Sequence, residues 1–430
     1  MRLFAPALLL AALPTAASAQ GFDVDAATRA WLDLLSGPAR AKSDAYFEGG
    51  YWLILWNALA AIACYGLILA TGWSARFRDI GERVSKRRWL VVTVTIALLT
   101  LVSSLILLPW EIYTDFVREG QYGLMNQTFG GWLADWAKAL ALSLILTPLL
   151  AIAIYAVIRR SPRGWWLWGT GVLTAFMAIG ALIAPVFIMP LFNTYTEMPA
   201  GPLRDRIVAV AKANAIPAEH IYVSDASRQT KRISANVSGL GPTIRITLND
   251  NLLKRTGPDE VVAVMGHEMG HYVRGHIWWL IGGFMVVIGA MLFAISRLAP
   301  RLIARNPRWG VREIADPASA PVLLLLASVA GLVLTPVQSS ISRTVEADAD
   351  RFGLDAAREP DGFAKAALRL SEYRKLEPGA LEEVIFYDHP SGYARIHRSM
   401  QWKKDHVPGA VMAKPELVPA LDPASSSPRP

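Results

Sequence analysis

Long runs of apolar residues dominate the chain and predict helices that cross a membrane. Six of them approach or exceed the roughly 20 residues that a helix needs to span a bilayer core. They lie at about 51–71, 89–109, 136–158, 166–192, 277–297 and 321–341. Many Trp residues lie near their ends, where interfacial side chains belong. The pattern indicates a multi-pass α-helical membrane protein.

The first residues have the layout of a secretory signal peptide. Arg2 precedes an apolar stretch, and Ala17, Ser18 and Ala19 form the small-residue site at which a signal peptidase cuts. We therefore expect a signal peptide at 1–19. The rival interpretation is an uncleaved first transmembrane helix.

Residues 193–276 have a different pattern, which predicts a mixed α+β region. An amphipathic helix is expected near 202–213, followed by β-like runs at 221–223 and 243–248. Gly239 and Gly241 lie between the two runs. An edge strand in this region could hold a peptide.

A second helix of this region is predicted to begin near residue 258. Thr256 is followed three residues later by Asp259, and Pro258 lies in the first turn, which is typical of a helix N-terminus. Apolar residues at 261–265 continue the helix.

Composition narrows the class of protein. The chain has 430 residues, is 53% hydrophobic and carries a formal net charge of +8. The Lys and Arg residues gather in short loops between apolar runs rather than on one face, so nucleic-acid binding is not expected. Cys64 is the only cysteine, which excludes an intrachain disulfide and a thiolate metal site. Nothing in the pattern indicates the oligomeric state.

Loop charges predict the orientation in the membrane. Lys and Arg are concentrated at 72–88, 159–165 and 297–320, whereas 110–130 holds Arg118 against three acidic residues. By the positive-inside rule, the three basic loops are cytoplasmic. The long segments that alternate with them are then external, in agreement with a cleaved signal peptide. We expect a bacterial inner membrane protein with its active domain on the periplasmic side.

The candidate chemistry lies on the helix that begins near residue 258. His267, Glu268 and His271 form an HExxH motif. On a helix, the i and i+4 spacing places both imidazoles on one face, where they can bind one zinc ion per chain. Glu268 lies beside them and can take a proton from a water molecule on the metal. The motif predicts zinc-dependent endopeptidic hydrolysis.

A catalytic zinc site usually has three protein ligands and one open position. The segment 342–350 is the best source of the third ligand. Two predicted spans separate it from His271, so both segments emerge on the same side of the membrane.

These motifs resemble the CAAX prenyl protease type 1 family of membrane-embedded zinc metallopeptidases, including its bacterial relatives. The resemblance covers roughly 45–400. It is carried by three ordered stretches: Glu260 to Gly266 leading into HExxH, Ser342 and Arg343 with Glu346, Ala349 and Asp350, and His389 and Pro390 with Arg395 and Ile396.

The resemblance implies a gluzincin-type catalytic domain joined to a helical membrane bundle that encloses a chamber. It implies Glu346 as the third metal ligand. It also implies that His389 and Arg395 contact the substrate backbone or its developing oxyanion, where donors stabilise negative charge. Asp350, one turn beyond Glu346, can accept the free N–H of a ligating imidazole.

Two departures from the family pattern limit the resemblance. The family commonly has Asn-Ala-Tyr before its Gly-Leu-Gly edge strand, whereas Ser234, Ala235 and Asn236 precede that segment here. Ala235 and Asn236 are the corresponding substrate-binding candidates. Eukaryotic members have seven spans and a cytosolic-facing site, while the loop charges predict six spans after cleavage and the opposite orientation. Peptide or membrane-protein substrates at the bilayer are therefore expected, and prenylated proteins, which are made in the cytosol, are not favoured. A prenylated peptide, a damaged membrane protein and a peptide signal are all compatible with the site.

Two nearby side chains are assigned no role in catalysis. His276 lies five residues beyond His271, about 140° away on a continuous helix, and is interpreted as structural. Asp348 is interpreted as solvated.

These features predict seven segments. They are a signal peptide or first helix (1–19), an external segment (20–50), a four-helix membrane region (51–192), the first part of the catalytic domain (193–276), two transmembrane helices (277–341), its second part (342–407) and a disordered tail (408–430).

Two rival functions remain. An intramembrane site-2-type protease would place HExxH inside an apolar span, and here Asp259, Glu260 and Arg274 flank the motif. A non-catalytic multi-span protein with a structural zinc site would have no need of Glu268.

Overall fold

The structure is a computed structural model, and it describes residues 22–217, 220–239, 244–412 and 415–417. The predicted signal peptide and most of the predicted tail lie outside these residues. Within the described part, six helices are long and apolar enough to cross a membrane, and each contains one of the six predicted runs or most of it. The expectation of a multi-pass membrane protein is confirmed.

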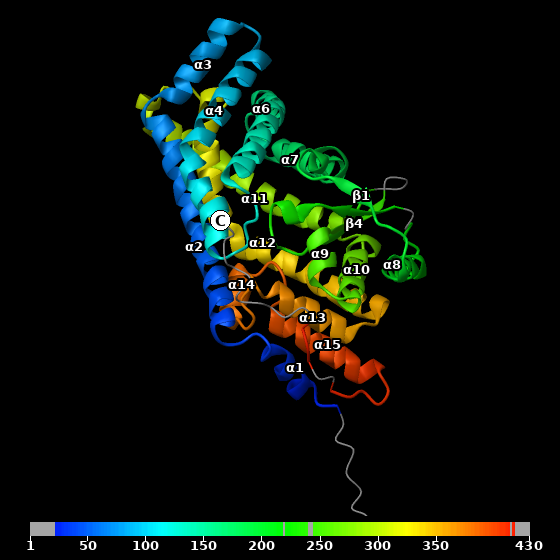
Figure 1. Ribbon diagram of the computed structural model, residues 1–430. Coiled ribbons are helices and arrows are strands. Elements are labelled where there is room, and N and C mark those ends of the chain that lie inside the picture. The colour runs from blue at the N-terminus through cyan, green and yellow to red at the C-terminus, as the bar shows by residue number, and fades with distance from the viewer. Residues whose placement is uncertain (1–21, 218–219, 240–243, 413–414, 418–430) are drawn as a thin grey trace, which may run out of the picture.

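The membrane region is a bundle of six long helices (Figure 1). They are α2 (Gly37–Ala70), α4 (Arg88–Glu111), α6 (Phe129–Arg160), α7 (Trp165–Ile183), α11 (His276–Arg305) and α12 (Ala320–Ala357). Short helical segments extend α4 through η1 (Ile112–Val117) and α5 (Arg118–Gln121), and α7 through η2 (Ala184–Ile188) and η3 (Met189–Leu191). An amphipathic helix, α3 (Trp73–Val84), joins α2 to α4.

Two boundaries differ from the prediction because helices continue beyond the apolar runs. Helix α2 begins at Gly37 with Pro38 in its first turn, a position that proline favours. Its first turns pack outside the apolar run, where Tyr46 donates to Glu119. Helix α12 continues without a break through residue 341, so one helix carries both an apolar span and the segment 342–350.

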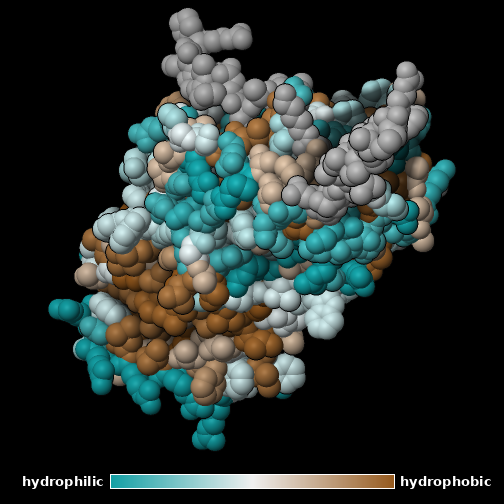
Figure 2. All heavy atoms as spheres, turned by 90° about the horizontal axis from the view of Figure 1, so that it is seen from below, coloured by the Kyte–Doolittle hydropathy of each residue, from teal (hydrophilic) through white to brown (hydrophobic). Residues whose placement is uncertain are grey.

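The bundle is apolar inside and outside. Its interior is built from buried side chains such as Ile68, Ile96, Tyr155, Trp165 and Ile295. Most of the exposed large hydrophobic side chains of the described chain also lie on the six helices. Figure 2 shows apolar side chains gathered in a patch on one face of the molecule, with mainly hydrophilic side chains beside it. Such an extended apolar surface requires a partner, and lipid supplies it.

The remaining elements form an α+β domain. Its sheet has the order β1 (Tyr195–Glu197), β2 (Ile221–Ser224), β4 (Arg245–Asn249), β3 (Ala235–Ser238). Strands β2 and β4 are parallel and the outer two pairs antiparallel. The region combines helices and strands, as predicted. The second predicted run forms β4, which is central, and β1 and β3 form the two edges of the sheet.

Seven further helices complete the domain. They are α8 (Pro202–Ala213), α9 (Asp250–Arg255), α10 (Pro258–Val273), α13 (Pro360–Leu370), α14 (Ala380–Phe386), α15 (Gly392–His406) and the N-terminal α1 (Val24–Leu32). Helix α8 has the predicted bounds. The core between sheet and helices includes Ile221, Ile246, Leu248, Met265 and Met269.

The N-terminus of α10 differs from its predicted form. The N-cap is Gly257, and the carboxylate of Glu260 accepts the Gly257 N–H at 2.7 Å. Thr256 instead donates to the carbonyl of Leu252 in the preceding helix. Asp259 pairs with Lys365 at 2.8 Å and ties α10 to α13. A glycine N-cap closed by Glu260 therefore replaces the predicted cap at Thr256.

The two ends of the molecule differ in character. The three basic loops meet at one end, because Lys86, Arg159 and Arg312 line a common pocket there. The segment that follows α4 contacts the α+β domain at the other end, where Arg232 pairs with Glu119 at 2.7 Å. Figure 1 shows α3 at one extreme and α1, α13 and α15 at the opposite one. This arrangement matches the alternation of loops expected for six spans.

Candidate metal centre

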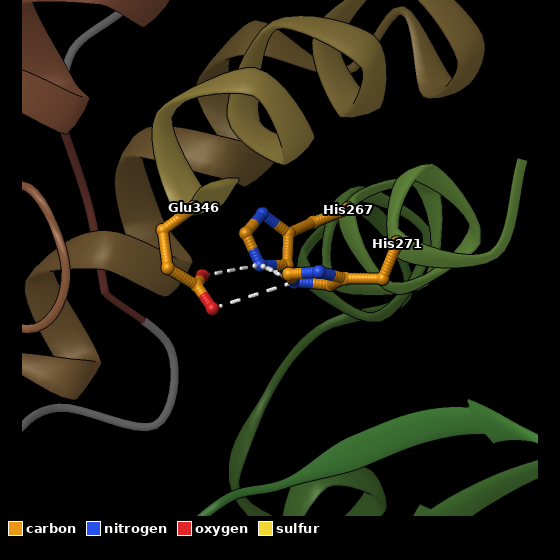
Figure 3. A group of neighbouring side chains, drawn as sticks. All are labelled: His267, His271 and Glu346. Atoms are coloured by element: carbon orange, nitrogen blue, oxygen red, sulfur yellow. Dashed lines mark hydrogen bonds and ion pairs between the residues drawn. The ribbon is translucent and has the colours of Figure 1, made fainter. Parts of the chain in front are cut away.

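Three side chains from two helices converge on one point. Helix α10 contributes His267 and His271, and α12 contributes Glu346 (Figure 3). The Nε2 atoms of the histidines are 3.2 Å apart, and the Glu346 carboxylate lies 3.1 Å from His267 Nε2 and 3.5 Å from His271 Nε2. One ligand atom from each residue lies within 4.8 Å of the others.

This donor set fits a divalent metal ion. Two imidazole nitrogens and one carboxylate oxygen form the set that catalytic zinc sites use. The Oε2 atom of Glu346 is buried and accepts no well-aligned hydrogen bond from the described residues, although His267 Nε2 lies 3.1 Å and His389 Nε2 3.3 Å away. A buried carboxylate oxygen without a well-aligned donor is costly, and a cation between these atoms would satisfy it.

Glycines allow the two ligand-bearing helices to approach each other closely. A Cβ atom added to Gly353 of α12 would lie 2.8 Å from the backbone nitrogen of His267. A Cβ added to Gly266 of α10 would lie 2.9 Å from the carbonyl oxygen of Gly353. Only residues without a side chain fit here, and this contact sets the distance between Glu346 and the histidines.

Asp350 contacts His267 on the side of the imidazole ring that faces away from the other two donors. Its Oδ1 lies 3.0 Å from His267 Nδ1, leaving Nε2 to face the centre. Burial alone would lower the pKa of His267, but Asp350 and Glu346 outweigh it and raise the pKa to about 9. Asp350 is fully buried, and both Arg395 and Arg398 donate to it at 2.7 Å. The structure thus brings Asp350 to the position expected of an imidazole acceptor.

His271 is held by a pair of residues that sequence reasoning missed. His276 is buried, with Nδ1 3.1 Å from His271 Nδ1 and Nε2 3.2 Å from the Asp348 carboxylate. The predicted separation of about 140° between His271 and His276 assumed one continuous helix, but α10 ends before His276. Gly275 has a φ of 64°, which turns the chain back and starts α11. Gly275, four residues after the end of the HExxH motif, was the sequence signal that could have predicted this turn.

Glu268 lies beside the centre and lines a cavity of about 170 Å³. Burial raises the pKa of its carboxyl group, and the neighbouring histidines oppose that effect. The cavity is also lined by Ala235 at the start of β3 and by Phe363 and Leu370 of α13. A carboxylate with a raised pKa at the wall of a cavity is suited to exchanging protons.

His389 reaches the same cavity. Its Nε2 lies 3.3 Å from Glu346 Oε2, and its Nδ1 lies 2.8 Å from Asp388. The loop that carries it is fixed by Arg343, which donates to the carbonyls of Glu383 and Tyr387 at 2.6 Å each. Arg343 therefore has a visible role in placing His389.

Of the three other predicted substrate contacts, Arg395 and Asn236 are placed less directly than Ala235. Arg395 lines the cavity, but its Nε and Nη2 atoms both donate to Asp350, so it acts on the centre through that carboxylate. Ala235 lines the cavity, whereas Asn236 does not, and the Asn236 Oδ1 is buried without a hydrogen-bond partner in the described part of the chain. Both residues pair with β4 and lie on the sheet edge nearest α10.

Comparison with known proteins gives consistent matches along the chain. Residues 33–194 match the family described as CAAX prenyl protease N-terminal, five membrane helices, and residues 197–403 match Peptidase family M48. The metalloprotease YhfN of Bacillus subtilis is 28% identical over 336 residues, which cover 77% of this chain and 79% of that protein.

Eukaryotic proteins match over a similar span. The probable CAAX prenyl protease 1 of Schizosaccharomyces pombe is 28% identical over 296 residues, 68% of this chain and 62% of its own length. The CAAX prenyl protease 1 homolog of Arabidopsis thaliana is 29% identical over 305 residues, 67% of this chain and 68% of its own length. The crystal structure of S. mikatae Ste24p superposes with a TM-score of 0.71 at 21% identity, covering 88% of this chain and 95% of that one, which shows a shared fold.

Proposed function

Because the chain belongs to peptidase family M48 and is a membrane zinc metalloprotease, we propose that His267, His271 and Glu346 bind its single zinc ion. Glu268 is then its general base. The observation that carries this proposal is the convergence of the three donors beside a cavity that Glu268 lines.

Different residues around the cavity would bind the metal and transfer the proton during peptide hydrolysis. A zinc ion bound there would polarise the scissile carbonyl and lower the pKa of a water molecule. Glu268 would accept a proton from the attacking water and deliver it to the leaving amide nitrogen. Its carboxyl group lines the cavity beside the three donors, so one group can hold the proton between the two steps.

The surroundings of Glu268 are suited to an extended peptide. Among the described strands, β3 pairs with β4 alone, so a substrate backbone can pair with its other side as an added strand. Phe363, Ala366 and Leu370 form an apolar wall for a side chain. His389 lies where a ring N–H can stabilise the negative charge that develops on the carbonyl oxygen.

The substrate class follows from where the cavity lies. Helix α11 begins at His276, five residues after His271, so the centre lies close to the membrane surface. Relatives are named CAAX prenyl proteases, but the basic loops lie at the end opposite the α+β domain. We therefore place that domain on the periplasmic face of a bacterial inner membrane, with peptides and membrane proteins at that face as substrates.

A site-2-type intramembrane protease is not favoured. Its HExxH motif would lie within an apolar span, whereas α10 is not among the six long apolar helices of the described chain.

The test is cleavage of a quenched peptide library by the purified protein in detergent. We expect cleavage that a chelator abolishes and added zinc restores. Glu268→Gln should lose at least 100-fold in rate, the lower range for a general base, while keeping near-stoichiometric zinc. Glu197→Gln, an exposed carboxylate on β1, is the matched control. Zinc bound by the unaltered protein without any cleavage would identify a structural site instead.

A further inference from the structure

A second pocket lies at the end of the molecule remote from the metal centre. It has a volume of about 600 Å³ and opens between the start of α4, the end of α6 and the loop that joins α11 to α12. Lys86, Arg88 and Arg159 line it together with apolar residues that include Val91, Ile158 and Ile314. We call these six residues and the space between them the basic pocket.

None of the three cations of the basic pocket forms an ion pair with a carboxylate of the described chain. Glu82 and Asp316 also line the space, but Glu82 pairs with Arg312 at 2.6 Å and Asp316 with Arg78 at 2.6 Å. The Lys86 ammonium donates to the backbone carbonyl of Glu82.

Arg88 and Arg159 repel each other, and neither is paired with a carboxylate anywhere in the described chain. Glu313 also lines the pocket, which leaves three cations against one unpaired carboxylate. Since like charges held together are unfavourable, the pocket is built for an anion.

The position of the pocket identifies the kind of anion. Arg88 begins α4 and Arg159 lies in the last turn of α6, so the cations lie where two membrane spans end. The free N–H groups of the first turn of α4 add to the positive potential there. Val91 and Ile158 line the same space, so the pocket joins positive charge to apolar side chains.

We propose that the basic pocket binds the phosphate headgroup of an anionic phospholipid. Basic pockets between transmembrane helices on the cytoplasmic side are suited to such headgroups. The site is independent of the metal centre and of the proposed peptidase activity. A lipid bound there would hold the helix bundle in contact with the membrane leaflet that the three basic loops face.

Native mass spectrometry of the full chain in neutral detergent tests this. Titration with phosphatidylglycerol should give one saturable lipid adduct, with phosphatidylcholine binding at least tenfold more weakly. The double variant Arg88→Gln/Arg159→Gln should weaken phosphatidylglycerol binding about tenfold or more. Arg88→Lys/Arg159→Lys should restore most of it and shows that folding is intact. Arg160→Gln/Arg163→Gln removes two charges at the same end outside the pocket and should have little effect.

Three results would overturn the proposal. Equal binding of the two lipids would mean that the headgroup charge is not recognised. Equal weakening by the control variant would reduce the effect to general surface charge. Competition by inorganic phosphate at the concentration at which the lipid binds would identify a site for a free anion.

Discussion

The two imidazoles of the metal centre are oriented by different partners. His267 faces the Asp350 carboxylate directly, whereas His271 faces His276, which in turn faces Asp348. If both Nε2 atoms face the metal, His271 Nδ1–H donates to His276 Nδ1, and His276 Nε2–H donates to Asp348. Each tautomer is thus fixed by the residue behind it.

We expect His276→Phe to weaken zinc binding about 10- to 100-fold, the usual effect of removing a partner that orients a ligand. His276→Asn keeps a donor and an acceptor and should lose less. Competition with a chromophoric chelator measures the dissociation constant, and His406→Phe on α15 is the control. Zinc affinity within twofold of the unaltered protein in His276→Phe would show that His276 only fills space.

The raised pKa of His267 predicts that zinc binding depends on pH. In the metal-free protein the imidazole keeps its proton up to about pH 9. Zinc needs the neutral ring, so binding must displace that proton. Apparent affinity should therefore rise as pH rises, by up to about tenfold per unit between pH 6.5 and 8.5.

Calorimetry in two buffers of different ionisation enthalpy measures the protons released on zinc binding. We expect about one proton at pH 7.5 from His267. No release at this pH would mean that the ring is already neutral and that Asp350 acts only by orienting it.

At the scale of elements, the centre depends on how closely α10 and α12 pack. Two of the three donors belong to α10 and the third to α12, and the helices touch through Gly266 and Gly353. HExxH fixes the spacing of its own histidines through the helix repeat. The distance to Glu346 is instead set by a contact between residues far apart in sequence.

Gly353→Ala tests this contact. The added methyl group would lie 2.8 Å from the His267 nitrogen, so the helices must separate. We expect a destabilisation of about 1–3 kcal/mol, the usual cost of overpacking, together with weaker zinc binding. Gly331→Ala on the same helix meets nothing within 4 Å and is the matched control. The two variants are compared by thermal unfolding and zinc content, and equal values would exclude a role for the contact.

The sequence predicted those elements whose signals are local. Apolar runs of sufficient length identified six spans, and the bounds of α8 followed from its own periodicity. The partners of Arg395 and His276 were not predicted. Arg395 contacts Asp350, which lies 45 residues earlier in the chain. His276 reaches His271 because the chain turns at Gly275. A helical-wheel argument assumes a continuous helix and cannot detect such a turn.

At the scale of the whole molecule, the arrangement of charge predicts which compartment the α+β domain faces. The three basic loops gather at one end, and the α+β domain lies at the other. By the positive-inside rule, we expect the basic end to face the cytoplasm. The orientation matters for function because prenylated proteins are made in the cytosol, so a periplasmic site would not meet them.

Single introduced cysteines can report this orientation, since the only native cysteine, Cys64, is buried. In spheroplasts, a membrane-impermeant maleimide should label Leu381→Cys, which lies on α14 and is 77% exposed. Arg163→Cys, in the exposed loop between α6 and α7, should be labelled only after lysis, and the unaltered protein should stay unlabelled throughout. The reverse pattern would place the metal centre in the cytosol, where lipid-modified cytosolic proteins would again be candidate substrates.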